Sequence, residues 1–186
     1  MPMIHSIISW LYCLDITHIL LLITAATGLF LYLQNQFSQT HFWKMLLVTA
    51  LICWGIAVLY STVWTRTGIQ ENGYALTPFH SYRAVWNGGN REIYRSNFMN
   101  ALLFYPSGLL TGAVLPRKWP VWLRCVIVVL SLTAFSAGIE WTQYRFALGQ
   151  CEIDDVIHNA AGALLGTLPV FLRHQGSSKK QHNQPI

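Results

Sequence analysis

The sequence predicts an all-α protein that crosses a membrane several times, as a bundle of about five transmembrane helices. Only 10% of its 186 residues are charged and 53% are hydrophobic, whereas about 25% of the residues in an ordinary soluble domain are charged. The mean hydropathy is +0.38, and the longest apolar stretches can cross a hydrocarbon layer about 30 Å thick. This composition excludes a typical soluble enzyme and a disordered chain. It also excludes a nucleic-acid-binding protein, because the 12 basic residues are scattered along the chain with no run longer than two.

Five stretches with few charges are the predicted spans. They cover residues 16–33, 45–65, 96–116, 119–139 and 156–172. The third stretch contains polar residues, a proline and glycines, so we expect the other helices to bury it. In the fourth, Arg124 is expected to extend its guanidinium group to the membrane interface.

Three regions follow from these spans. Residues 1–76 hold two N-terminal helices and the start of an outer loop, and residues 77–174 hold a core of three helices. Residues 175–186 are predicted to be a polar, disordered cytoplasmic tail.

The charges predict an orientation with the N-terminus outside and the C-terminus inside. With this orientation, seven basic residues lie on the cytoplasmic side and five on the outer side, as the positive-inside rule favours. All seven acidic residues then lie on the outer side. The unusual polar residues therefore gather at one membrane face.

The four cysteines give no metal-binding spacing. Cys53 and Cys125 lie within predicted helices and are interpreted as small buried apolar residues. Cys13 and Cys151 would both lie near the outer face, where a disulfide between them is one option that spacing alone leaves open.

One face of the fifth span is rich in polar and small residues. On a helix, Asp155, His158, Asn159, Gly162 and Gly166 recur at spacings that place them on the same side. The two glycines favour close approach of a second helix. Asp155 lies at the positive end of the helix dipole.

The end of the fourth span faces this group across a short loop. Ser136, Glu140 and Gln143 share one helix face. Asp154, just before the fifth span, is a favourable N-cap. A polar group is retained in hydrocarbon only when it is paired or has a function. Glu140, Asp155 and His158 are therefore candidate catalytic residues as well as candidate ligand-binding residues.

The third span opens with a second polar group. Arg95, Asn97 and Asn100 begin it, and Pro106 and Gly108 follow, where a kink or break in the helix is predicted. Arginine binds carboxylates and phosphates through two parallel hydrogen bonds. The candidate ligand-binding residues are Arg95, Asn97, Asn100, Glu140, Gln143, Asp154, Asp155, His158 and Asn159. A closed structural network of these side chains is the alternative.

Four motifs, in order, resemble the VanZ-like family of integral membrane proteins. They are Pro78-Phe79, then N-x-x-x-F-x-P-x-G from Asn100, S-x-x-I-E-x-x-Q from Ser136, and D-D-x-x-x-N-x-x-G-x-x-x-G from Asp154. The resemblance covers residues 77–172, about half of the chain. It implies a multi-pass protein of the cell membrane and a link to resistance against teicoplanin and related glycopeptide antibiotics. Those drugs act at the outer membrane face, on lipid-linked cell-wall precursors.

Three functions remain open. The first is a non-catalytic protein that modulates cell-envelope function or antibiotic susceptibility by binding a lipid, a wall precursor or a drug. The second is a membrane-embedded enzyme in which Glu140, Asp155 and His158 act as an acid–base or metal site. The third is a small transporter component. The first predicts no metal or cofactor, no nucleic acid, and as partners the lipid bilayer, a lipid-linked precursor or a glycopeptide.

Overall fold

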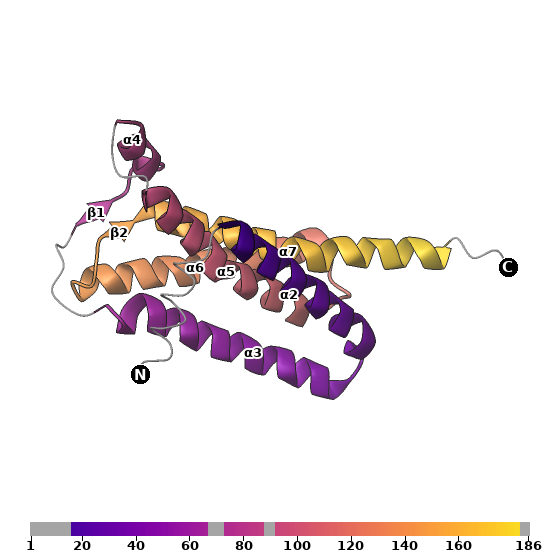
Figure 1. Ribbon diagram of the computed structural model, residues 1–186. Helices are drawn as coiled ribbons and strands as arrows, with labels where there is room; N and C mark the ends of the chain where they lie inside the picture. The colour runs from indigo at the N-terminus through magenta and orange to yellow at the C-terminus, as the bar shows by residue number, and fades with distance from the viewer. Residues whose placement is uncertain (1–15, 67–72, 88–91, 183–186) are drawn as a thin grey trace. The chain divides into compact units, whose positions relative to one another are not determined.

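The computed structural model describes residues 16–66, 73–87 and 92–182 (Figure 1). The chain divides into two compact units, with the boundary between Trp43 and Lys44. The first unit contains helix α2 (Ile16–Phe37) and the start of helix α3 (His41–Leu59). At their junction the Trp43 indole donates a hydrogen bond of 2.6 Å to Oε1 of Gln34. Because Trp43 is also flanked by the rings of Phe30 and Phe37, it closes the turn between the two helices.

In the second unit, the described residues form the rest of α3 and four further α-helices. Helix α3 continues into a π-helical segment, η1 (Tyr60–Trp64). The other helices are α4 (His80–Trp86), α5 (Glu92–Val114), α6 (Val121–Arg145) and α7 (Ile153–His182). Two short strands, β1 (Tyr74–Ala75) and β2 (Cys151–Glu152), pair in parallel, with Tyr74 opposite Cys151.

The predicted all-α, multi-pass fold is confirmed. Among the described residues, four helices are long and apolar enough to cross a membrane; they span His18–Phe37, His41–Trp64, Val121–Arg145 and Ile153–Leu172. Helix α5 has 23 residues and contains most of the third predicted span, but it does not belong to this group. It runs through Pro106 as one helix. At the other end of the chain, α7 continues to His182, into the segment expected to be a polar tail.

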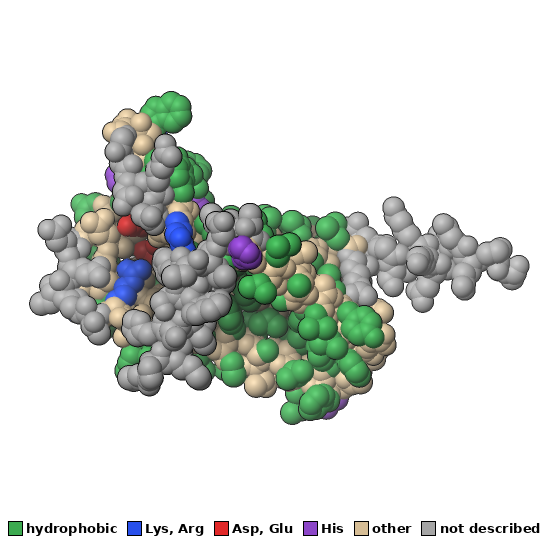
Figure 2. All heavy atoms as spheres, in the orientation of Figure 1, with side chains coloured by type: hydrophobic (Ala, Val, Ile, Leu, Met, Phe, Trp, Pro, Cys, Tyr) green, Lys and Arg blue, Asp and Glu red, His purple; other side chains and the backbone are tan. Residues whose placement is uncertain are grey.

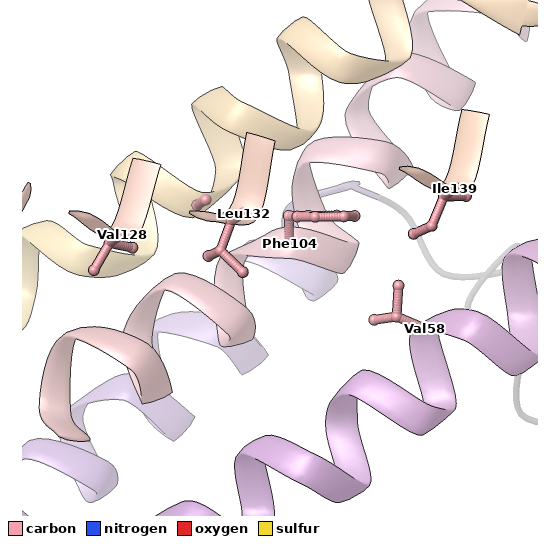
Figure 3. Packing of buried hydrophobic residues seen from close by; sticks show 6 residues of the cluster. Val58, Phe104, Val128, Leu132 and Ile139 are labelled. Atoms are coloured by element: carbon pink, nitrogen blue, oxygen red, sulfur yellow. The ribbon is translucent and has the colours of Figure 1, made fainter. Parts of the chain in front are cut away.

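Helix α5 packs most extensively against α7, and both pack against α6. The hydrophobic core comprises Val58, Phe104, Val128, Leu132, Ile139 and Ala163. Figure 3 shows Val58 of α3 pointing toward Phe104 of α5 and Ile139 of α6. The Trp54 indole also donates to the Leu103 carbonyl at 3.1 Å, so the part of α3 in this unit is attached to α5 by both apolar and polar contacts.

Glycines bring the backbones of α5 and α7 into direct contact. A Cβ atom on Gly162 would lie 1.9 Å from the Ala101 carbonyl oxygen, and one on Gly166 would lie 1.9 Å from that of Tyr105. On the facing helix, a Cβ on Gly108 would lie 1.9 Å from the Ala163 oxygen. No side chain fits at these positions. The glycines therefore allow α5 and α7 to pack closely in this one register.

The structure corrects two expectations about single residues. Arg124 does not reach the interface: it is 1% exposed, its Nη2 donates to the Gly112 carbonyl at 2.9 Å, and its guanidinium lies 4.3 Å from the Phe171 ring centroid. A carbonyl and an aromatic face within reach make burial favourable here. Cys53 is exposed rather than buried, as a lipid-facing residue of α3 would be.

Candidate functional site

A polar cavity of about 510 Å³ lies where α5 and α7 begin. Its lining residues are Arg66, Ile93, Ser96, Asn97, Gln150, Glu152 and Asp155. They come from four places: the end of η1, the first turns of α5, strand β2 with the residue before it, and the first turn of α7. In Figure 2, charged side chains are visible at one end of the surface, apart from a broad hydrophobic area.

Glu140 holds strand β2 beside this cavity. The Glu140 side chain is 3% exposed, and its Oε2 accepts a hydrogen bond of 3.0 Å from the backbone N–H of Glu152. The neighbouring Cys151 N–H donates to the Gly73 carbonyl at 3.0 Å. Glu140 therefore positions Glu152, the residue of β2 that lines the cavity.

Asp154 fixes the start of α4. Its carboxylate accepts hydrogen bonds from the backbone N–H of Phe79 at 2.5 Å, and from the N–H and hydroxyl of Ser81 at 2.8 and 2.5 Å. Phe79 has a φ of 61°, a left-handed conformation that is costly for a side chain of this size. The Asn97 amide of α5 donates to the Ser81 hydroxyl at 3.0 Å. Asp154 and Asn97 thus attach α4 to α7 and α5.

His158 belongs to the same attachment and does not line the cavity. Its Nδ1 lies 2.5 Å from the Asp154 carbonyl oxygen, which can only accept, so Nδ1 carries a proton. Its Nε2 lies 2.7 Å from the Tyr82 hydroxyl, and the two rings are stacked. In the neutral imidazole, Nε2 accepts from that hydroxyl. Both ring nitrogens are therefore occupied.

Asp155 faces the cavity. The side chains of Arg66 and Asn100 lie beside its carboxyl group. The Asn100 Nδ2 is nevertheless buried without a hydrogen bond of good geometry. Asp155 is thus the one acidic residue of the Asp pair that is available to a molecule in the cavity.

Gln143 and Asn159 link helices and are not in the cavity lining. The Gln143 amide donates to the Thr62 carbonyl at 2.9 Å, and the Asn159 amide donates to the Ser136 hydroxyl at 2.8 Å. Each side chain is at least nine-tenths buried, and each leaves its own amide oxygen without a partner. They form a polar layer between α6, α7 and η1.

Cysteine chemistry is not favoured at the cavity. Cys151 is a free thiol, and Cys13, its suggested disulfide partner, lies outside the described residues. Burial raises the pKa of the Cys151 thiol, and the carboxylates of Glu140 and Glu152 raise it further. Among the residues that the structure describes, no group of three or more His, Cys, Asp or Glu side chains could hold a metal ion.

Of the nine candidate ligand-binding residues, the structure places Asn97 and Asp155 in the cavity lining. Asn100 and Glu140 lie directly behind it, while Asp154, His158, Gln143 and Asn159 connect helices. Arg95 lies on α5 and is not a lining residue. Sequence reasoning missed Arg66, Ser96, Gln150 and Glu152. Gln150 and Glu152 could have been noticed because they lie close to the Asp pair in the sequence. Arg66 could not, because it lies 84 residues before Gln150.

The fold and this cavity define a class: a helical membrane protein with several apolar spans and a charged cavity at the ends of its helices. Comparison with known proteins gives the family. The VanZ/LLP1 family model matches residues 45–174, so the chain belongs to that family, as the motifs predicted. The match begins in α3, earlier than the core expected from residue 77.

A curated relative agrees with this assignment. The chain is 32% identical over 115 residues to Protein VanZ of Enterococcus faecium. This alignment covers 62% of the chain and 60% of the relative, so the chain spans less than two thirds of that protein's length. No solved structure matches the chain.

Proposed function

We propose that this protein resides in the cell membrane and modulates cell-envelope function or susceptibility to glycopeptide antibiotics of the teicoplanin type. It does so by binding a lipid, a lipid-linked wall precursor or the drug at the outer membrane face. The observation that carries the proposal is the cavity of about 510 Å³ with Arg66, Glu152 and Asp155 in its lining. Its volume lies within the range of sites that bind small molecules, about 300–1,000 Å³.

Membership of the VanZ/LLP1 family supports the phenotype in this proposal. The cavity supports a binding role, because it brings together one guanidinium, two carboxylates, two amides and one hydroxyl group. Closely placed opposite charges orient a ligand and select its charge pattern.

The alternative is a membrane-embedded enzyme with Glu140, Asp155 and His158 as an acid–base or metal site. The geometry supports it less well. Both nitrogens of His158 are engaged with α4 and the α7 backbone, and Glu140 is engaged with the N–H of Glu152. Only Asp155 of the three faces the cavity.

The test is expression of the full chain in a susceptible host, followed by measurement of the minimal inhibitory concentration of teicoplanin. We expect the intact protein to raise this concentration at least fourfold. Asp155→Asn and Arg66→Gln, each expressed at the intact level, should return it to the vector value. Lys118→Gln is the matched control, because Lys118 is exposed in the turn between α5 and α6. An unchanged concentration with the intact protein in several hosts, or full activity of both cavity variants, would contradict the proposal.

A further inference from the structure

An apolar groove of about 600 Å³ lies between the α3–η1 segment and α6. Ile56, Tyr60 and Trp64 form part of one wall, and Ala134 and Gly138 form part of the other. Ile56 is 61% exposed, so this part of the groove is open at the surface of the helix bundle. In a membrane, that opening faces the acyl chains of the bilayer.

The groove has the depth of one leaflet. Its α6 wall runs from Ala134 to Thr142, nine residues whose eight steps correspond to about 12 Å at the rise of an α-helix. Half of a hydrocarbon layer is about 15 Å thick. A single acyl chain lying along α6 would therefore fill the groove from the bilayer centre to the end of the helix.

The linings of the groove and of the polar cavity come close in the sequence at two places. Trp64 lines the groove, and Arg66, two residues later, lines the cavity. Ile139 of α6 lines the groove, while the next residue, Glu140, bonds to the backbone of the cavity residue Glu152. At this junction the Gln143–Thr62 hydrogen bond holds α6 against η1. A molecule with an apolar tail and a polar head could occupy both spaces.

The charges of the cavity indicate which head it would take. The Arg66 guanidinium suits a phosphate, but Glu152 and Asp155 repel further negative charge and attract a cation. A pyrophosphate headgroup would bring at least two negative charges toward two carboxylates. A headgroup that carries a protonated amine beside one phosphate would pair with both kinds of side chain.

We infer that the groove and the cavity together bind one phospholipid whose headgroup carries a protonated amine beside its phosphate. The acyl chain lies in the groove, the phosphate meets Arg66, and the ammonium group meets Glu152 and Asp155. This inference rests on the proposed function. Of the three ligands named there, which are a lipid, a lipid-linked wall precursor and the drug, it selects the lipid.

The experiment is native mass spectrometry of the full chain, titrated in detergent with three lipids. These are phosphatidylethanolamine, phosphatidylglycerol with the same acyl chains, and a polyprenyl pyrophosphate. We expect phosphatidylethanolamine to bind at least tenfold more tightly than the other two. The double variant Glu152→Gln, Asp155→Asn should abolish that preference.

A glycine variant tests the groove without disturbing the fold. A Cβ on Gly138 would meet nothing within 4 Å, and Gly138 lines the groove, so the side chain of Gly138→Leu would start in open space and occupy part of the groove. It should weaken phosphatidylethanolamine and phosphatidylglycerol equally, by at least fivefold. Gly55→Leu is the matched control, because Gly55 also has open space and does not line the groove.

Two results would overturn the inference: phosphatidylglycerol or the pyrophosphate binding as tightly as phosphatidylethanolamine, or Gly55→Leu weakening binding as much as Gly138→Leu. The drug assay separates this outcome from failure of the proposed function. If Asp155→Asn abolishes the effect on teicoplanin susceptibility but the intact protein shows no lipid preference, the proposed function stands and the inference fails. If the intact protein prefers phosphatidylethanolamine but does not change susceptibility, the inference stands and the proposed function fails.

Discussion

The carboxylate of Asp154 shows how one acidic residue can hold several segments together. Asp154 lies in the first turn of α7, and the sequence alone suggests that its side chain caps this helix. In the structure it accepts three hydrogen bonds from Phe79 and Ser81 at the start of α4. These bonds stabilise the left-handed backbone of Phe79, and they keep α4 beside α5 and α7.

We therefore expect Asp154→Ala to lower the free energy of unfolding by about 3 kcal/mol, because three donors lose a charged acceptor. Equilibrium unfolding in mixed detergent micelles, followed by circular dichroism, measures this change. Asp155→Asn is the control and should cost less than about 1 kcal/mol, since it keeps the shape of the side chain and the three Asp154 bonds. Equal losses in the two variants would show that Asp154 has no special structural role.

The neighbouring acidic residues differ in role although they look alike in sequence. Asp154 and Glu140 are buried and bond to backbone N–H groups, whereas Asp155 and Glu152 line the cavity. The sequence could predict that acids gather here. It could not assign the roles, because a side chain's direction depends on which helix packs beside it.

At the scale of elements, the contact between α5 and α7 organises the second unit. Gly108, Gly162 and Gly166 let the two backbones meet, and each glycine lies against a carbonyl of the other helix. This contact covers one side of α5, whose composition is less apolar than that of the four candidate spans. It also brings Ser96 and Asn97 of α5 next to Asp155 of α7, and so forms two sides of the cavity.

Gly166→Ala should separate these helices, because its new Cβ would lie 1.9 Å from the Tyr105 carbonyl oxygen. We expect a loss of about 3 kcal/mol in the free energy of unfolding, as for strong overpacking of a core. Gly138→Ala is a matched control on α6: its Cβ has open space, and alanine favours a helix by about 1 kcal/mol over glycine. Equal unfolding midpoints for the two variants in mixed micelles would mean that the glycine contact does not stabilise the fold.

At the scale of the whole molecule, the orientation in the membrane remains a prediction from charge. The polar cavity must face the outer side for the proposed function to hold. Residues 66, 93–97 and 150–155 should then lie at the outer face, and the helices should carry the chain back to a cytoplasmic C-terminus.

Reporter fusions test this orientation. We expect a fluorescent protein fused after Ile186 to be bright and alkaline phosphatase at the same place to be inactive, because only the first matures in the cytoplasm. Alkaline phosphatase inserted after Asn87, which follows α4, should be active. The opposite pattern at both positions would reverse the orientation and remove the cavity from the outer face.

The sequence by itself determined the class of protein. Scarce charge and long apolar stretches require helices in a membrane, because backbone groups in hydrocarbon must bond within their own segment. Motifs from Pro78 to Gly166 predicted the family, and the concentration of acids around Glu140 and Asp155 predicted the region of the site. These features are local in the chain, so they can be read without knowing which helices touch.

Only the tertiary structure decided which polar residues face open space. Arg66 reaches the cavity because η1 packs against α6, and Glu152 reaches it because Glu140 and β1 hold β2 in place. His158, a strong candidate by spacing, is instead bonded to Tyr82 of α4. Arg124, expected at the interface, is buried against Gly112 and Phe171. The physical reason is the same in each case: a polar side chain in an apolar interior takes the nearest partner, and long-range packing determines which partner is near.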